Sequence, residues 1–118
     1  MEAWKRARIL CRKIHKLTHR EPFSRDFKFK SQIEDSSGSI MDNIAEGFER
    51  GGNKEFTNFS IIEKGSSGEI KSQLYRALDK DNISPEEFND CYKDADDIAG
   101  MLTEPDKVPS GFRLQRYK

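Results

Sequence analysis

The fold of this chain is decided by residues 39–78, which read SIMDNIAEGFERGGNKEFTNFSIIEKGSSGEIKSQLYRAL. Apolar residues recur on both sides of a central break at steps of three, four and seven, which places them on one face of a helix. They are Ile33, Ile40, Ile44 and Phe48 before the break and Phe59, Ile62, Ile70, Leu74, Ala77 and Leu78 after it. Gly51-Gly52 ends the first helix, and the side chain of Asn53 can cap the second. So short a break predicts two long helices that fold back as an antiparallel hairpin.

Small residues lie inside both arms of this hairpin. They are Ser36, Ser37, Gly38, Gly47, Gly65, Ser66, Ser67 and Gly68. A glycine inside a helix costs about 1 kcal/mol relative to alanine. Because several such residues are retained despite this cost, we expect the two helices to lie in close contact at these points.

A basic helix precedes the hairpin, from about Ala3 to His19. Its apolar seam alternates steps of four and three, as in a helical bundle. The seam consists of Ala3, Ala7, Leu10, Ile14 and Leu17. Pro22 then disfavours helical geometry at the residue before it. The first arm of the hairpin is therefore expected to begin near Arg25, with Ser24 as its cap, and to reach Glu49.

The second arm is expected from Lys54 to Asp79, and a fourth helix follows it. Ser84-Pro85-Glu86-Glu87 combines a serine cap, a proline in the first turn and a glutamate at the capping-box position. This start predicts a helix that runs to about Thr103. The sequence thus predicts an all-α, antiparallel up-and-down four-helix bundle over residues 1–104, with a basic C-terminal tail at 105–118.

Composition fits a small folded domain without a membrane segment. The chain has 118 residues, of which 34% are hydrophobic and 36% charged. A core this lean predicts that part of the apolar surface is buried between subunits. No apolar run is long enough to span a bilayer, and the N-terminus lacks the apolar core of a signal peptide. A cytoplasmic location is therefore expected.

The net charge is zero, but the charges are unevenly distributed. Residues 1–30 carry ten basic and three acidic residues, whereas residues 79–106 carry ten acidic and two basic residues. Such asymmetry can mark an electrostatic binding face. It can equally reflect a basic helix that lies beside an acidic one.

Cysteine and histidine are sparse. Cys11 and Cys91 lie far apart at helical apolar positions and are expected to be buried, reduced thiols. His15 and His19 are four residues apart and can share a helix face. No acidic or cysteine partner is evident near them, so we expect no metal site and no cofactor.

The middle of the chain resembles a known family. Asn43-Ile44-Ala45-Glu46-Gly47 followed by Arg50, and Gly65-Ser66-Ser67-Gly68-Glu69, are similar to two signatures of the four-helix-bundle proteins encoded in intervening sequences of bacterial 23S rRNA genes. The similarity covers about residues 4 to 102. It implies a bundle of four helices in a ring-shaped homo-oligomer, with a pentamer favoured. It also implies relatedness to the nucleic-acid-binding accessory protein of diversity-generating retroelements, and it brings no catalytic residues.

Signals for catalysis are weak, since the chain has no GxSxG, HExxH or phosphate-binding glycine motif. Glu46 and Glu69 are the most plausible functional carboxylates. We interpret them as structural groups that accept hydrogen bonds or pair with Arg50 or another basic residue. Asn43 likewise reads as a polar residue that sets helix register.

Two functions remain open. In the first, a non-enzymatic oligomer binds RNA or DNA phosphates through basic residues of the first helix. The candidates are Arg8, Arg12 and Lys16, with Lys5 and Lys13. In the second, the protein is an assembly or adaptor protein whose charged helices contact other subunits or proteins. The neutral total weakens the first hypothesis, since nucleic-acid binders are usually net basic. The acidic pair Glu34-Asp35 also weakens it, because members of the resembled family often carry basic residues at this place.

Overall fold

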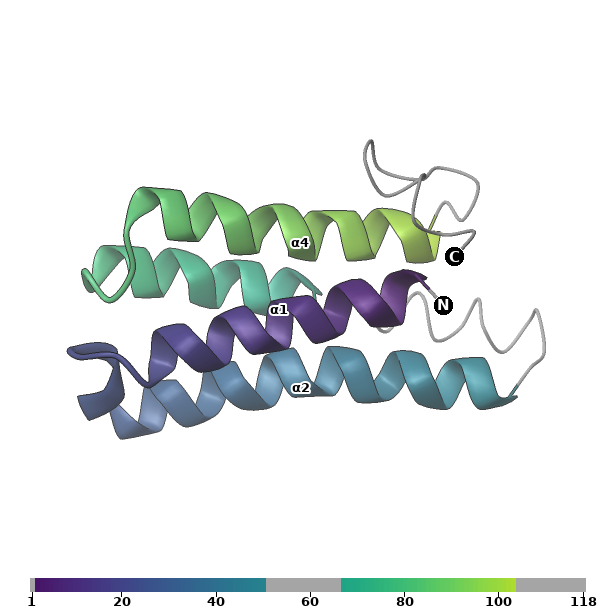
Figure 1. Cartoon of the computed structure of the whole chain (residues 1–118), viewed down its shortest axis with the longest axis horizontal. Helices are drawn as coiled ribbons and strands as arrows, with labels where there is room; N and C mark the ends of the chain where they lie inside the picture. The colour runs from purple at the N-terminus through teal and green to yellow at the C-terminus, as the bar shows by residue number, and fades with distance from the viewer. Residues whose placement is uncertain (1, 51–66, 104–118) are drawn as a thin grey trace.

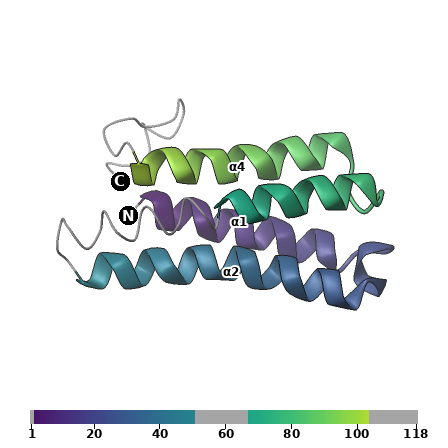
Figure 2. The ribbon, with the colours of Figure 1, turned by 180° about the vertical axis from the view of Figure 1, so that it is seen from behind.

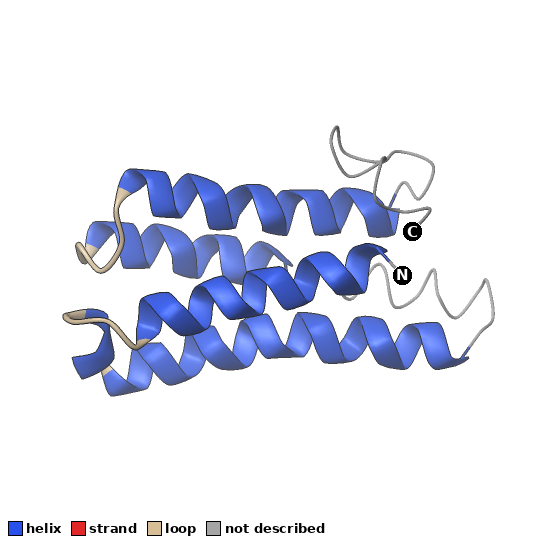
Figure 3. Ribbon diagram, viewed as in Figure 1, coloured by secondary structure: helices blue, strands red, loops and turns tan. Residues whose placement is uncertain are grey.

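The computed structural model describes residues 2–50 and 67–103, and every long element in this part is an α-helix (Figures 1 and 3). Helix α1 spans Glu2–Thr18, α2 spans Phe27–Arg50 and α4 spans Pro85–Thr103, while residues 67–79 form the described part of the third helix. A short 3-10 helix, η1, covers Phe23–Arg25. The predicted all-α class is confirmed. No helix among the described residues is both long and apolar enough to cross a membrane.

Neighbouring helices run in opposite directions, as the order of their contacts shows (Figure 2). Near the start of α1, Arg6 contacts Asp94 of α4, whereas Arg20, beyond the end of α1, contacts Glu87, which lies earlier in α4. The same reversal relates the third helix to its neighbours, through Ser36 with Glu69, Asp26 with Lys80, Lys71 with Asp96, and Tyr75 with Phe88. The described helices therefore alternate in direction around a common core.

The core is built from the predicted seams. All five seam residues of α1 are buried, and so are Ile33, Ile40 and Ile44 of α2. The buried residues of the third helix are Ile70, Leu74 and Ala77, and those of α4 include Cys91, Ala95, Ile98 and Leu102. Full burial of one such aliphatic side chain contributes about 1.5–3 kcal/mol relative to exposure. One helical face from each segment therefore meets in a single core.

The start of α2 differs from the prediction. Ser24 lies in η1, and Asp26 caps α2 instead, because the Lys30 amide donates to the Asp26 carbonyl and the Phe29 amide donates to the Asp26 carboxylate. A carboxylate at this position also faces the positive end of the helix dipole. The two nearby phenylalanines separate, since Phe29 is buried against Phe23 while Phe27 is 78% exposed.

The predicted start of α4 is confirmed as a capping box. The Glu87 amide donates to Ser84 Oγ at 3.1 Å, and the Ser84 amide donates to Glu87 Oε1 at 2.8 Å. Arg20 also donates to Glu87 Oε1, at 2.7 Å. Hydrogen bonds from Arg20, aided by Ser84, lower the pKa of Glu87 from 4.5 to about 2. Glu87 thus ties the segment after α1 to the first turn of α4.

This lowered pKa predicts a loss of stability in acid. The folded-state pKa lies below the unfolded value, so the contribution is complete above about pH 4.5 and is lost as the pH falls toward 2. We expect Glu87→Gln, which keeps the capping geometry, to cost about 1 kcal/mol at pH 7 after solvent screening. Urea unfolding of both proteins should converge near pH 2. A difference that persists unchanged at pH 2 would contradict this role for the carboxylate.

The prediction that helical glycines mark close helix–helix contact is wrong for Gly38 and Gly68. A Cβ built on Gly38 or Gly68 meets no atom of the described residues within 4 Å, so within that part of the chain neither residue marks a close approach of backbones. The neighbouring serines Ser36, Ser37 and Ser67 are buried, and so is Gly47. The cost of a glycine inside a helix indicated tight helix–helix packing at Gly38 and Gly68. Within the described chain, the residues that are buried between helices at these two places are the adjacent serines.

Gly38 therefore offers a stabilising substitution. It lies inside α2, and an added methyl group meets open space in the described chain. We expect Gly38→Ala to raise the free energy of unfolding by up to about 1 kcal/mol, because alanine restricts the unfolded chain and favours the helix. Thermal unfolding at one protein concentration measures this. A clear loss of stability would show that a second chain covers Gly38.

Several predictions lie outside the described residues. They concern the Gly51-Gly52 break, the Asn53 cap, the start of the third helix at Lys54, the signature residues Gly65 and Ser66, and the tail at 105–118.

Candidate nucleic-acid interface

The basic residues of the N-terminal segment fall into two groups that face different directions. The seam assigns Ala7 and Ile14 to heptad position a, and Ala3, Leu10 and Leu17 to position d. Arg6, Lys13 and Arg20 then occupy position g, which flanks the core. Arg8, Arg12 and Lys16 occupy the outward positions b, f and c. The rotation of α1 about its axis therefore decides which cations meet other helices.

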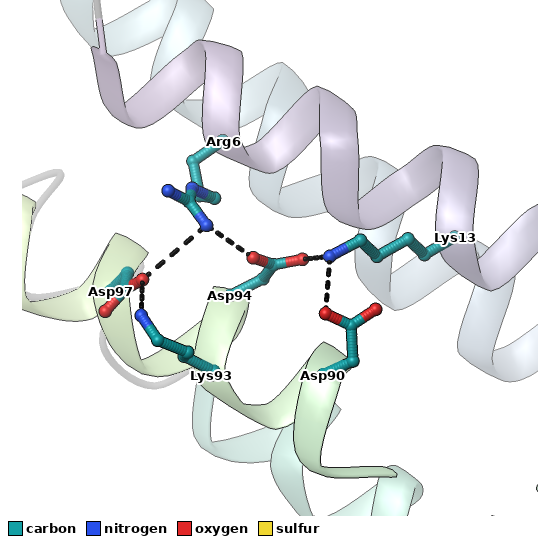
Figure 4. A network of polar contacts seen from close by, with 6 residues as sticks. All are labelled: Arg6, Lys13, Asp90, Lys93, Asp94 and Asp97. Atoms are coloured by element: carbon teal, nitrogen blue, oxygen red, sulfur yellow. Dashed lines mark hydrogen bonds and ion pairs between the residues drawn. The ribbon is translucent and has the colours of Figure 1, made fainter. Parts of the chain in front are cut away.

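The cations at g positions bind α4 (Figure 4). The side chain of Asp94 is only 2% exposed, and its Oδ1 and Oδ2 lie 2.7 Å from Arg6 Nη1 and from Lys13 Nζ, respectively. Its side chain is thus satisfied from two sides, as a buried carboxylate requires. Asp97, 3.6 Å from Arg6 and 3.0 Å from Lys93, extends the network along α4.

Lys13 is the most tightly held of these cations. Its ammonium group also lies 2.9 Å from Asp90. Burial by itself would lower the pKa of Lys13, but its hydrogen bonds to Asp94 and Asp90 outweigh that effect and raise the pKa. The structure therefore places Lys13, one of the five candidate phosphate contacts, in the α1–α4 interface. The uneven charge along the sequence is partly a basic helix lying beside an acidic one within the same chain.

The outward cations Arg8, Arg12 and Lys16 form what we call the basic ridge. All three are exposed, and among the described residues no carboxylate lies within ion-pair distance of them. They line a hollow of about 380 Å³ between α1 and α2 together with Cys11, His15 and Met41. Lys5, at the N-terminal end of α1, is exposed and lies 3.8 Å from Glu2. Lys5 and the ridge can therefore meet a ligand in solvent.

Both cysteines are free thiols with no sign of activation. Burial raises the pKa of Cys11 on the floor of the hollow, and the nearby charge of Asp42 adds to the effect. The Cys11 thiol donates to the Ser37 carbonyl at 3.1 Å. Burial raises the pKa of Cys91 to about 12. Both groups remain protonated near neutral pH, so neither supplies a reactive thiolate.

Comparison with known proteins agrees with this architecture. The family model described as 23S rRNA-intervening sequence protein matches residues 1–104. The chain belongs to this family. A comparison with curated proteins finds no match.

Of the residues that the sequence analysis took as signatures, Asn43, Glu46 and Gly47 lie on α2, and Ser67, Gly68 and Glu69 lie on the described part of the third helix. Glu69 Oε1 lies 3.1 Å from the Ser36 hydroxyl, which joins these two helices. Gly47 is buried, Asn43 is half-buried, Glu46 is exposed, and α2 ends at Arg50. The Ser36–Glu69 hydrogen bond is of the kind expected if Glu69 has a structural role.

One cluster in this family member was missed by the sequence analysis. Glu34 of α2 lies beside both histidines, with Glu34 Oε2 3.4 Å from His15 Nδ1 and 3.8 Å from His19 Nδ1. The expectation that the histidines have no acidic partner is therefore wrong. Cys11 and Thr18, both at position e of the α1 heptad, contact α2. This side of α1 therefore faces α2, and an acid of α2 such as Glu34 could have been considered as a partner for the histidines.

Proposed function

We propose that this family member is a non-enzymatic, cytoplasmic homo-oligomer that binds RNA or DNA without sequence preference through the basic ridge of α1. The observation that carries the proposal is the division of the α1 cations. Arg6 and Lys13 are engaged by α4, whereas the ridge residues lie exposed with no described carboxylate beside them. Exposed, unneutralised cations in a row are what contact with a phosphate backbone requires.

The spacing of the ridge suits a linear polyanion. Steps of four residues advance about 6 Å along a helix and stay close to one line. Lys5 extends the row toward the N-terminus. No Phe, Tyr or Trp is among the described residues that line the hollow, so this surface offers mainly phosphate contacts. Such contacts position a nucleic acid without reading its sequence.

We propose a ring-shaped homo-oligomer, with a pentamer favoured, as the form that binds. Phe27 is 78% exposed and Tyr75 is also exposed, which supports contacts with further copies. A ring would repeat the ridge around its axis, and several weak contacts would then act together through effective concentration. Sedimentation equilibrium should give a species larger than the monomer at micromolar concentration. A single monomeric species would contradict this part of the proposal.

Fluorescence anisotropy with labelled single- and double-stranded RNA and DNA tests the binding function. We expect affinities that vary little with sequence and fall steeply with salt, because each neutralised phosphate releases counterions. Scrambled sequences of equal length serve as the matched control. Absence of binding to all four ligands by the wild-type oligomer at low salt would end this proposal.

The alternative function is an assembly or adaptor protein whose charged helices contact proteins instead of nucleic acid. The exposed aromatic residues Phe27 and Tyr75 favour it. We rank it second because Glu87, Asp94 and Asp97, acids that it could use, already bind cations of the same chain. It predicts that substitutions in the ridge loosen the assembly, which light scattering measures beside the anisotropy.

A further inference from the structure

The cluster of His15, His19 and Glu34 brings three metal-binding side chains together from two helices. His15 lies in the last turn of α1 and His19 directly follows the helix, with ring centroids 4.0 Å apart. Glu34 reaches them from α2. One ligand atom from each of the three residues lies within 4.8 Å of the others. All three side chains are at least partly accessible to solvent, so an ion can enter without opening the core.

We propose that His15, His19 and Glu34 form a site for a divalent transition-metal ion of the zinc class. Two imidazoles and one carboxylate are a ligand set that Zn²⁺, Co²⁺ and Ni²⁺ accept. Bonds of about 2.1 Å at tetrahedral angles place ligand atoms about 3.4 Å apart. His15 Nδ1 and Glu34 Oε2 already have this separation, at 3.4 Å. One ligand atom of each residue lies within 4.8 Å of the others, and rotation of the exposed histidine side chains can bring them to this separation.

Outer contacts orient two of the ligands. The hydroxyl of Thr18, which is fully buried, lies 3.0 Å from Glu34 Oε2. His19 Nδ1 lies 2.7 Å from the His15 carbonyl, and that acceptor assigns the proton to Nδ1. Nε2 of His19 is then left with the free electron pair for the metal. Ligating histidines commonly donate their second nitrogen to a carbonyl in this way.

The site has a structural consequence because it joins α1 to α2 beside the turn that contains η1. The three ligands converge only in the folded chain, so metal binding stabilises the folded state. Three protein ligands leave a fourth position of a tetrahedral ion for water or another donor. This inference is independent of the proposed nucleic-acid binding, because it uses different residues and has its own readout.

The test uses the full chain without a histidine tag, treated with chelator and then titrated with ZnCl₂ by calorimetry and with CoCl₂ by absorption. We expect one ion per chain with a micromolar Kd and the visible d–d bands of a low-coordinate Co²⁺ site. A hundredfold excess of Zn²⁺ over Kd should raise Tm by roughly 10 °C. Histidine ring resonances should shift in the same titration.

Variants locate the site. Glu34→Gln preserves size, and the double variant His15→Ala with His19→Ala removes both imidazoles. Each should weaken binding more than about tenfold, because losing a ligand costs more than losing an outer-shell partner. Glu86→Gln, a change to an exposed acid on α4, is the matched control and should bind as the wild type does. Circular dichroism confirms that every variant is folded.

Three results would overturn the proposal. The first is the absence of heat or spectral change at millimolar metal. The second is wild-type stoichiometry and affinity in both ligand variants, which would place the ion elsewhere in the chain. The third is a sulfur-to-cobalt charge-transfer band, which would show that a cysteine belongs to the ligand set.

Discussion

Replacing Asp94 with alanine is expected to lower the free energy of unfolding by about 3 to 5 kcal/mol, the range for breaking a buried ion pair from one side. The carboxylate is 2% exposed and holds Arg6 and Lys13 at 2.7 Å each. Its removal leaves two cations in the α1–α4 interface without their main partner. Arg6 keeps Asp97 at 3.6 Å and Lys13 keeps Asp90 at 2.9 Å, so we expect a value near the lower end.

Asp90→Ala is the matched control for this prediction. It removes a carboxylate from the same network, but the Asp90 side chain is 60% exposed and Lys13 retains Asp94. Exposed ion pairs contribute only about 0–1 kcal/mol. Urea unfolding followed by circular dichroism, at one protein concentration, measures both variants. Equal losses would show that burial of Asp94 does not determine its contribution.

Changing Arg8, Arg12 and Lys16 together to glutamine is expected to weaken nucleic-acid binding by roughly 10²- to 10³-fold at 0.1 M salt. Each phosphate contact contributes about 0.7 to 0.9 to the slope of log affinity against log salt. Removing three contacts should therefore flatten the slope by about 2 to 3. Helicity should stay intact, because these side chains are exposed and none has a carboxylate partner among the described residues.

A second triple variant separates the ridge from total charge. Arg25, Lys28 and Lys93 are exposed and lie outside α1, and changing them to glutamine alters the net charge by the same amount. We expect this control to lose far less affinity and to keep most of the salt slope. Equal losses in the two variants would mean that binding follows net charge and not the ridge. A triple ridge variant that instead dissociates the oligomer would support the adaptor function.

Within the described chain, the sequence by itself determined which segments are helical. The seam of α1 and the capping box at Ser84 and Glu87 depend on contacts within one or two helical turns, and both are present as predicted. Local preference was insufficient at the start of α2, where Ser24 and Asp26 are both good caps. Because Ser24 lies within η1, which covers Phe23–Arg25, Asp26 is the residue that caps α2.

Only the tertiary structure decided which charged residues are engaged and which are left for a partner. The helices of a bundle can follow one another in a left-handed or a right-handed order with the same apolar seam. The periodicity of the sequence identifies the seam but not this handedness. In this chain, position g faces the acidic α4 and position e faces α2. With this rotation of α1 against its neighbours, Lys13 pairs with Asp94, Arg12 is exposed to solvent, and Glu34 lies beside His15. The apolar seam alone does not specify that rotation, so only the tertiary structure decides these contacts.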